Sequence, residues 1–181
     1  METALLDALA ADLGTGFEKL VRTRQHRLFA FAFALTGDSG EAEDAAQEAF
    51  VRAYRALEGY PPERIRELKL DGWLHTIALN VVRNQRRRPR LTVLELDEDR
   101  DRDPFGGPEA AYEQAETQAK LAAEVSALPP AQRDAVVLRC VQGFKYSEVA
   151  ELLEQPLGTV KSNVHRALET LRARLESEVV R

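Results

Sequence analysis

The sequence predicts an all-α protein of two small helical domains joined by an acidic, flexible linker. Apolar residues recur every three or four positions through most of the chain, with no strand-like alternation. This periodicity is lost between residues 91 and 108. Charge is also uneven, because residues 1–90 and 128–181 each carry a net charge of +1, whereas residues 91–127 carry −7. We therefore expect a first domain at 17–88, a linker at 89–108 and a second domain at 109–178.

The first domain is predicted to be a compact bundle of three helices. Its first helix spans residues 17–36, and Gly37 is a suitable C-cap. Asp38 or Ser39 caps a second helix over residues 40–57, whose first turns are acidic as the helix dipole favours.

A loop and a third helix complete this domain. The loop covers residues 60–70 and contains Pro61 and Pro62, after which one helical turn can form. Asp71 is expected to be the N-cap of the third helix, which Pro89 ends. Residues 1–16 have only a weak helical pattern, and we assign them no function.

The predicted linker contains a run of charges at residues 95–103. Little apolar area is available there to offset the entropy of ordering. Fully extended, residues 91–108 could span roughly 60 Å.

The second domain is predicted to end in a helix-turn-helix. Helices at 109–127 and 131–141 precede a short amphipathic segment at 147–153, which Pro156 separates from a second helix starting near Gly158. The apolar residues of this last helix are spaced as one buried stripe, namely Leu157, Val160, Val164, Leu168, Leu171 and Leu175.

The opposite face of the last helix is basic. Residues 158–175 hold four basic residues and one acidic residue. Such a face is suited to phosphates and base edges in a major groove, although an ordinary helical hairpin with a solvated face is the alternative. The polar side chains of this face are Lys161, Ser162, His165, Arg166 and Arg172.

Composition limits the function classes. The single cysteine, Cys140, excludes an internal disulfide and a cysteine-cluster zinc site, and we expect it to be buried as a small apolar side chain. The first residues lack a basic signal-peptide segment and no apolar run approaches a membrane span, so we expect a cytoplasmic protein without membrane insertion.

Several segments resemble the sigma-70 family, and specifically bacterial RNA polymerase sigma factors of the extracytoplasmic-function type. Residues 44–50 (DAAQEAF) and 73–80 (WLHTIALN) resemble segments of the family's region 2. Four further segments resemble the family's region 4, namely residues 128–133 (LPPAQR), 143–150 (GFKYSEVA), 158–162 (GTVKS) and 165–167 (HRA). The order and spacing of these segments are more specific than any one of them.

The resemblance implies a transcription initiation factor, not an enzyme, that needs no metal or cofactor. Such a protein binds core RNA polymerase through the β′ clamp and β flap. It directs the enzyme to promoter DNA by recognising the minus-35 element and melting the minus-10 element. An anti-sigma factor is a further expected partner, and the acidic linker would thread the polymerase toward its active-site cleft.

The resemblance assigns the polymerase-docking surface to the second helix. Glu41, Asp44 and Glu48 share one face there, which could also be a merely solvated acidic face. A metal site is disfavoured because no Glu is followed three residues later by His. The residues assigned to docking are Asp44, Gln47, Glu48 and Phe50.

The resemblance places minus-10 recognition on the loop and the third helix. Aromatic and polar side chains beside a basic rim can hold an unpaired base. The loop is about four residues longer than the usual family pattern, with Pro61 and Pro62 in place of the common Arg-Gly, and Trp73 is expected to be a core residue. The assigned residues are Tyr60, Arg64, Lys69, Trp73, His75, Asn80 and Arg83.

Contacts to the minus-35 element are implied for region 4. Asn163 stands where the family usually has arginine. The assigned residues are Arg139, Lys161, Ser162, Asn163, His165 and Arg166.

Two other functions remain open from the residues themselves. A stand-alone helix-turn-helix transcriptional regulator would bind specific DNA without polymerase. A metal-dependent enzyme built on the acidic helix would need histidine partners, which that helix lacks.

Overall fold

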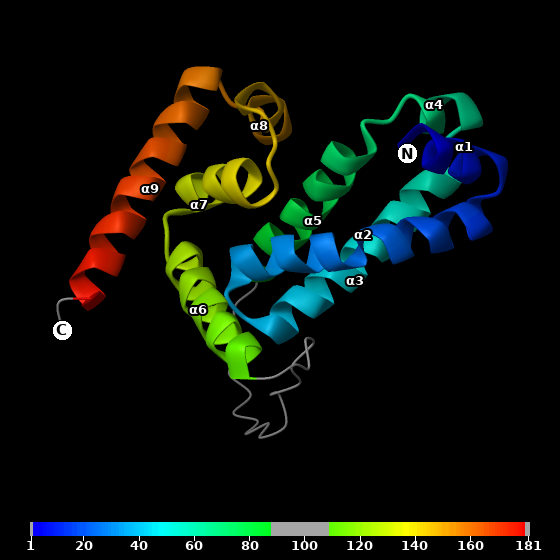
Figure 1. The fold of residues 1–181 in the computed structure, drawn as a ribbon. Helices are drawn as coiled ribbons and strands as arrows, with labels where there is room; N and C mark the ends of the chain where they lie inside the picture. Colours follow the sequence, from blue (N-terminus) through cyan, green and yellow to red (C-terminus); the bar gives the residue numbers. More distant parts are fainter. Residues whose placement is uncertain (1, 88–108, 180–181) are drawn as a thin grey trace.

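The structure is a computed structural model that describes residues 2–87 and 109–179. The all-α prediction is confirmed, since every regular element in these two stretches is helical (Figure 1). The predicted linker at 89–108 lies outside the described residues. The helices are α1 (Glu2–Ala11), α2 (Leu13–Thr36), α3 (Ser39–Glu58), α4 (Pro62–Arg66), α5 (Leu70–Arg87), α6 (Glu109–Ser126), α7 (Pro130–Val136), a π-helical turn η1 (Val137–Val141), α8 (Tyr146–Leu153) and α9 (Leu157–Val179).

The N-terminal bundle is formed by α2, α3 and α5, which pack against one another. Its predicted caps are confirmed. Gly37 has a φ of 75°, the left-handed conformation that glycine adopts at least cost, and its N–H donates to the Phe33 carbonyl. The Asp38 carboxylate accepts a hydrogen bond of 2.8 Å from the Glu41 N–H, which satisfies one of the free donors at the start of α3.

The beginning of the chain differs from the prediction. Residues 2–11 form a full helix, α1, and α2 begins at Leu13 rather than near residue 17. The reason is local capping, because the Asp12 carboxylate accepts from the Gly14 N–H at 3.0 Å. Hydrogen bonds from Thr15 and Gly14 also keep the pKa of Asp12 below its usual value.

The expected capping role of Asp71 is wrong. Helix α5 begins one residue earlier, at Leu70, and the Leu70 N–H donates to the Glu2 carboxylate from α1. Asp71 instead accepts from Arg24 at 2.7 Å and from Arg27 at 3.1 Å, so it joins α5 to α2.

The helix-turn-helix is present in the C-terminal domain, but its buried stripe is narrower than predicted. Glu154 ends α8 with a φ of 53°, and α9 starts after Pro156. The buried apolar positions of α9 are Val160, Val164, Ala167 and Leu171. The remaining leucines of the predicted stripe lie outside the narrow arc that faces α7 and α8, and they are 40–47% exposed: Leu157, Leu168 and Leu175.

Cys140 is exposed, which corrects the prediction of a buried thiol. It lies in the π-helical turn, whose wider spacing of residues shifts the α-helical pattern on which that prediction depended. Val137 and Leu138 of the same turn are buried in its place.

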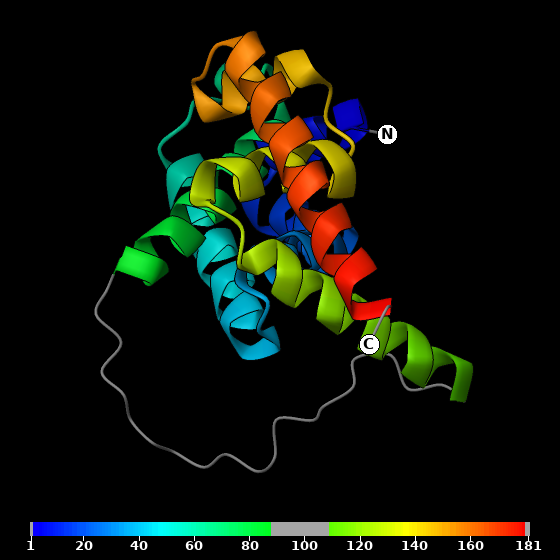
Figure 2. The same cartoon turned by 90° about the vertical axis from the view of Figure 1, so that its left-hand side faces the viewer.

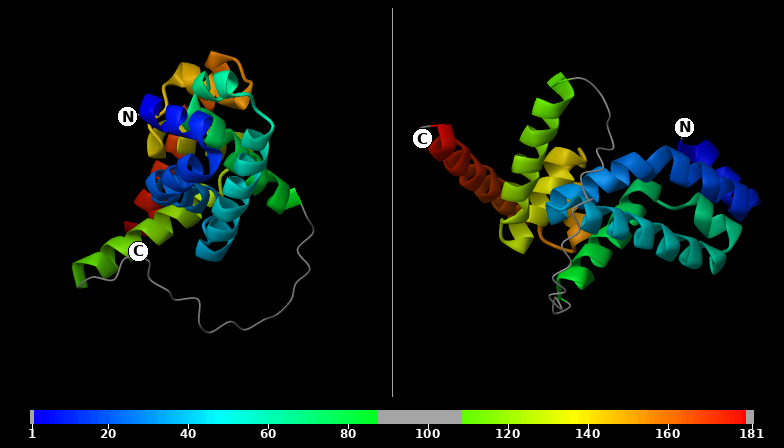
Figure 3. Two further views of the ribbon diagram at one scale, coloured as in Figure 1. Left: turned by 90° about the vertical axis from the view of Figure 1, so that its right-hand side faces the viewer. Right: turned by 90° about the horizontal axis from the view of Figure 1, so that it is seen from below.

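The two domains pack against each other in a closed arrangement (Figure 2; Figure 3, right). Helix α6 crosses α2, the turn η1 also contacts α2, and α8 contacts α5. The buried apolar residues of both domains form one continuous core. No helix in the described part of the chain is both long and apolar enough to span a membrane.

Candidate functional site

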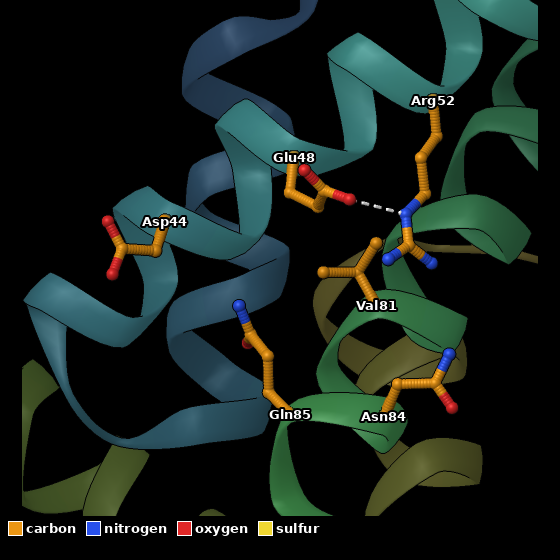
Figure 4. Close-up of a pocket in the computed structure, with 6 residues that line it drawn as sticks. All are labelled: Asp44, Glu48, Arg52, Val81, Asn84 and Gln85. Carbon is orange, nitrogen blue, oxygen red and sulfur yellow. Dashed lines mark hydrogen bonds and ion pairs between the residues drawn. The ribbon is translucent and has the colours of Figure 1, made fainter. Parts of the chain in front are cut away.

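The acidic face of α3 is open to solvent. Asp44 and Gln47 are exposed, while Glu48 is half-buried and accepts a hydrogen bond of 2.7 Å from Arg52. This face and α5 enclose a shallow pocket of about 300 Å³ (Figure 4). Its lining residues are Asp44, Glu48, Arg52, Val81, Asn84 and Gln85. Carboxylates above a short apolar floor suit a partner that presents arginine.

Phe50 does not line this pocket. It is 9% exposed, and its ring packs edge-on against Phe17 with 6.2 Å between centroids. It lines a second, mostly apolar depression together with Phe17, Tyr54 and the exposed Val51. Phe50 is therefore largely buried, but it contributes to this depression rather than to the acidic face.

The loop before α5 brings together a group of aromatic and basic side chains. The Arg64 guanidinium lies 3.8 Å from the centre of the Tyr60 ring, and that ring is 6.3 Å from the ring of Trp73. Trp73 also packs against the core, as expected. Asn80 is exposed two turns further along the same face of α5. These four residues could form a stacking surface with a polar neighbour.

His75 is buried between the two domains. It is 2% exposed, and its ring lies edge-on to Phe31 of α2 and to Phe144 of the C-terminal domain. Nδ1 is 2.6 Å from the Asp71 carbonyl oxygen, and Nε2 is 3.0 Å from Oε1 of Gln142. The closed arrangement therefore does not bring His75 to the predicted DNA surface.

Burial lowers the pKa of His75, because desolvation disfavours the charged ring. The hydrogen bonds to Asp71 and Gln142 act in the opposite direction but do not cancel this shift. Of the charged neighbours, Arg27 lowers the pKa and Asp71 raises it. Both partner atoms are acceptors, so a neutral ring, which has one N–H, can donate only one of these two hydrogen bonds.

Arg83 and Lys69 also contact the C-terminal domain. The Arg83 guanidinium donates two hydrogen bonds, of 3.0 and 2.7 Å, to the carboxylate of Asp134, whose side chain is only 3% exposed. Lys69 forms an exposed ion pair of 2.7 Å with Glu151. Both predicted DNA contacts are thus engaged within the chain.

Gln142 is the interface residue that sequence reasoning missed. Its side-chain oxygen accepts from Arg27 Nε at 3.0 Å as well as facing His75, and its backbone carbonyl accepts from Arg27 at 2.8 Å. An uncharged residue before a glycine has no periodicity or motif that would mark such a role.

The start of α9 presents four of the predicted minus-35 residues on one surface. Lys161, Ser162, His165 and Arg166 are exposed, and His165 Nδ1 lies 3.2 Å from a Glu169 carboxylate oxygen. A helix that presents such side chains from its first turns is suited to a major groove.

The two other predicted minus-35 residues support the motif from within. Asn163 is buried and donates to Gln155 Oε1 at 3.4 Å, which ties α9 to the turn before it. Arg139 lies over the Tyr146 ring at 4.9 Å and donates to the Phe144 carbonyl, so it braces the segment before α8.

The metal-site reading finds no support in residues 2–87 and 109–179. Within these residues no group of three or more His, Cys, Asp or Glu side chains is arranged to hold a metal ion.

Two family models match the chain. The model for sigma-70 region 2 matches residues 20–92, and the model for sigma-70 region 4 matches residues 118–171. Each match falls in one of the two helical domains.

Full-length relatives give the same result. The chain is 37% identical over 174 residues to the ECF RNA polymerase sigma factor SigE of Mycolicibacterium smegmatis, covering 94% of this chain and 66% of that protein. It is 32% identical over 165 residues to the RNA polymerase sigma-H factor of Pseudomonas aeruginosa, covering 86% and 83% of the two chains. The chain thus spans just under two thirds of the length of the first relative.

A solved structure shares the fold. The sigma factor RpoE of Bartonella quintana, in complex with the anti-sigma factor NepR, aligns with a TM-score of 0.66 at 24% identity. The alignment covers 88% of this chain and 96% of the other.

Proposed function

Because the chain belongs to the sigma-70 family of RNA polymerase sigma factors, we propose that it is a transcription initiation factor of the extracytoplasmic-function type. In this role it binds core RNA polymerase and directs it to specific promoters. The observation that carries this function is the exposed polar face at the start of α9, in a chain whose other domain matches region 2. A stand-alone regulator would not need the second matched domain.

The N-terminal domain is proposed to dock on the polymerase through α3. Asp44, Gln47 and Glu48 contribute an accessible acidic face for the β′ clamp, and Phe50 contributes to the apolar depression on the same helix. The neighbouring loop and α5 contribute the minus-10 surface, where Tyr60, Arg64, Trp73 and Asn80 are accessible or half-exposed.

The C-terminal domain is proposed to recognise the minus-35 element. Lys161, Ser162, His165 and Arg166 supply side chains for phosphates and base edges. The β flap binds the same domain on another face. The acidic linker at 89–108 is proposed to thread the polymerase toward its active-site cleft.

Promoter engagement requires the two domains to separate. In the closed arrangement Arg83 is held by Asp134, and His75 is enclosed by Gln142 and Phe144. Any role of these two residues at the minus-10 element therefore begins once the C-terminal domain has moved away from α5.

Partners other than polymerase and DNA follow from the same proposal. The solved relative was captured with an anti-sigma factor, and we extend this kind of partner to the present chain. The protein acts where the polymerase and the chromosome are, in the cytoplasm, and performs no catalysis of its own.

Run-off transcription tests the proposal. Bacterial core RNA polymerase is incubated with a library of genomic fragments, with and without the purified chain. We expect a small set of transcripts that appear only when the chain is present. Specific DNA binding by the chain alone, without any polymerase-dependent transcript, would instead identify a stand-alone regulator.

Arg166→Ala provides the matched variant for the DNA-binding part. Because one phosphate contact contributes about one unit to the slope of log affinity against log salt, the variant holoenzyme should bind its promoter more weakly and with a slope about one unit shallower. The control is Arg22→Ala, which removes an exposed arginine from α2 in the other domain. An unchanged slope for Arg166→Ala would remove this residue from the interface.

A further inference from the structure

The loop that the proposed function assigns to the minus-10 element cannot hold its own shape. Its helix α4 has five residues, Pro62–Arg66, far fewer than an isolated helix needs for stability. Pro61 at its N-cap makes no side-chain capping hydrogen bond, and Ile65 is its one buried residue. The conformation of residues 60–70 must therefore come from what packs against them.

Helix α1 lies directly against this loop (Figure 1; Figure 3). Asp7 pairs with Arg66 at 3.4 Å, and the Glu2 carboxylate accepts from the Leu70 N–H at 3.2 Å, at the point where the loop becomes α5. Three leucines on the Glu2 face of α1 are buried: Leu5, Leu6 and Leu9. Helix α1 thus contacts the loop through two polar ties, and its buried leucines belong to the same core as Ile65 of α4.

The same loop carries the proposed DNA contacts. Arg64 stacks on Tyr60, whose ring is 6.3 Å from that of Trp73. The loop therefore both contacts α1 and holds side chains that would meet an unpaired base. A shift of α1 would move α4, and with it Arg64.

The position of α1 is in turn set by one glycine. A Cβ on Gly16 would lie 2.6 Å from both Cα and N of Leu9, which is backbone and cannot move as a flexible side chain can. The close crossing of α1 and α2 therefore requires glycine at this position.

We propose that α1 is a positioning element that holds loop 60–70 in the conformation that reads the minus-10 element. This inference rests on the proposed function. It also gives the extra residues of the loop a purpose, since the longer loop folds as α4 against α1. The residues through which α1 acts are Glu2, Leu5, Leu6, Asp7 and Leu9, with Gly16 fixing their distance from α2.

Gly16→Ala tests this inference, with Gly14→Ala as its matched control. Both glycines lie in the first turns of α2, so alanine raises helix propensity at either. Only at Gly16 does the new methyl group collide with the backbone of α1. At Gly14 the nearest atom is Asp12 Oδ1 at 3.5 Å, an ordinary contact.

The readout is base discrimination at each promoter element. Wild-type holoenzyme first selects a promoter from a DNA pool randomised at both elements. Transcription is then compared between this promoter and versions with one base changed in either element. A single mismatch should reduce wild-type transcription roughly tenfold.

For Gly16→Ala we expect the minus-10 penalty to fall to about threefold or less, while the minus-35 penalty and the affinity for core polymerase stay unchanged. Gly14→Ala should behave as wild type. Full minus-10 discrimination in Gly16→Ala would overturn the inference. If the wild-type chain selects no promoter at all, the proposed function has failed instead.

A second variant decides the matter if Gly16→Ala does not fold, as judged by circular dichroism. Glu2→Ala with Asp7→Ala removes the two polar ties and leaves the buried leucines in place. Its control, Glu18→Ala with Glu58→Ala, removes the same charge from two exposed sites. The inference is supported if the Glu2/Asp7 double variant loses minus-10 discrimination, to a smaller extent than expected for Gly16→Ala, while the Glu18/Glu58 double variant does not. Equal discrimination in the two double variants overturns it.

Discussion

Helices α3 and α5 carry the proposed contacts of the N-terminal domain, and they differ in how far the C-terminal domain covers them. The acidic residues Glu43, Asp44 and Glu48 of α3 are exposed or half-exposed, and Glu48 pairs with Arg52 of the same helix. On α5, His75 and Arg83 are instead held by the C-terminal domain. The closed arrangement therefore leaves the proposed polymerase-docking face open while it covers part of the proposed DNA-reading face.

This difference suggests an order of events. A partner that binds α3 meets no obstacle from the C-terminal domain, whereas DNA at Arg83 must compete with the buried carboxylate of Asp134. Polymerase docking can thus precede domain separation. The strength of the domain contact then sets how much of the minus-10 surface is available.

The largest effect is expected from breaking the buried ion pair. Arg83→Ala leaves the Asp134 carboxylate in the interface without its main partner, which should lower the free energy of unfolding by about 3 kcal/mol. Urea denaturation measures this loss. Small-angle scattering should show a larger radius of gyration under native conditions.

Asp134→Ala is the complementary change. It removes the buried carboxylate but leaves the buried Arg133 guanidinium, 3.8 Å away, without its acidic neighbour, so it should also lower the free energy of unfolding. Equal stability of Arg83→Ala and wild type would mean that the closed arrangement does not depend on this pair.

Charge reversal on α3 should weaken polymerase binding while leaving stability unchanged. Asp44→Arg places a cation on a face proposed to meet arginines, so affinity for core polymerase should fall roughly tenfold. The melting temperature should stay close to that of wild type, since Asp44 is exposed. Glu58→Arg, at the far end of the same helix, controls for net charge. Loss of stability without loss of affinity would contradict the docking assignment.

Mild acid should weaken the closed arrangement. Burial lowers the pKa of His75 in the folded chain, so below the ordinary histidine value of about 6.5 the unfolded chain binds more protons than the folded one. Stability then falls as the pH drops from about 7 toward 5, and above about 7 this contribution is constant.

Thermal melts of wild type and His75→Gln across this pH range check the expectation. The variant should be less stable at neutral pH and should lose less on acidification, because glutamine does not titrate. Parallel pH profiles for the two proteins would show that His75 does not control the response.

Contacts within one helix could be predicted from the sequence, whereas contacts between the two domains could not. Gly37 and Asp38 act within one turn of their own helices, so their capping roles could be read from neighbouring residues. The contact between His75 and Gln142 joins positions 67 residues apart, and no local pattern marks either one. The sequence therefore predicted most of the helices, but not α1 or the closed arrangement that covers α5.

The errors on the C-terminal domain have similar causes. Leu168 has the right spacing for a buried stripe, yet α7 and α8 cover only a narrower arc of α9. Cys140 follows a helical pattern that the π-helical turn interrupts. In both cases the exposure of the side chain depends on which neighbouring helix packs against it, and helical periodicity does not contain that information.

The smallest effect is expected at the second ion pair between the domains. Lys69 and Glu151 are 2.7 Å apart, as close as Arg83 and Asp134, but both side chains are mostly exposed. Water screens such a pair, and fixing two long side chains offsets what attraction remains. Lys69→Ala should therefore leave the melting temperature and the radius of gyration unchanged. A marked expansion of Lys69→Ala would show that exposed charges, rather than the buried Arg83 contact, hold the domains together.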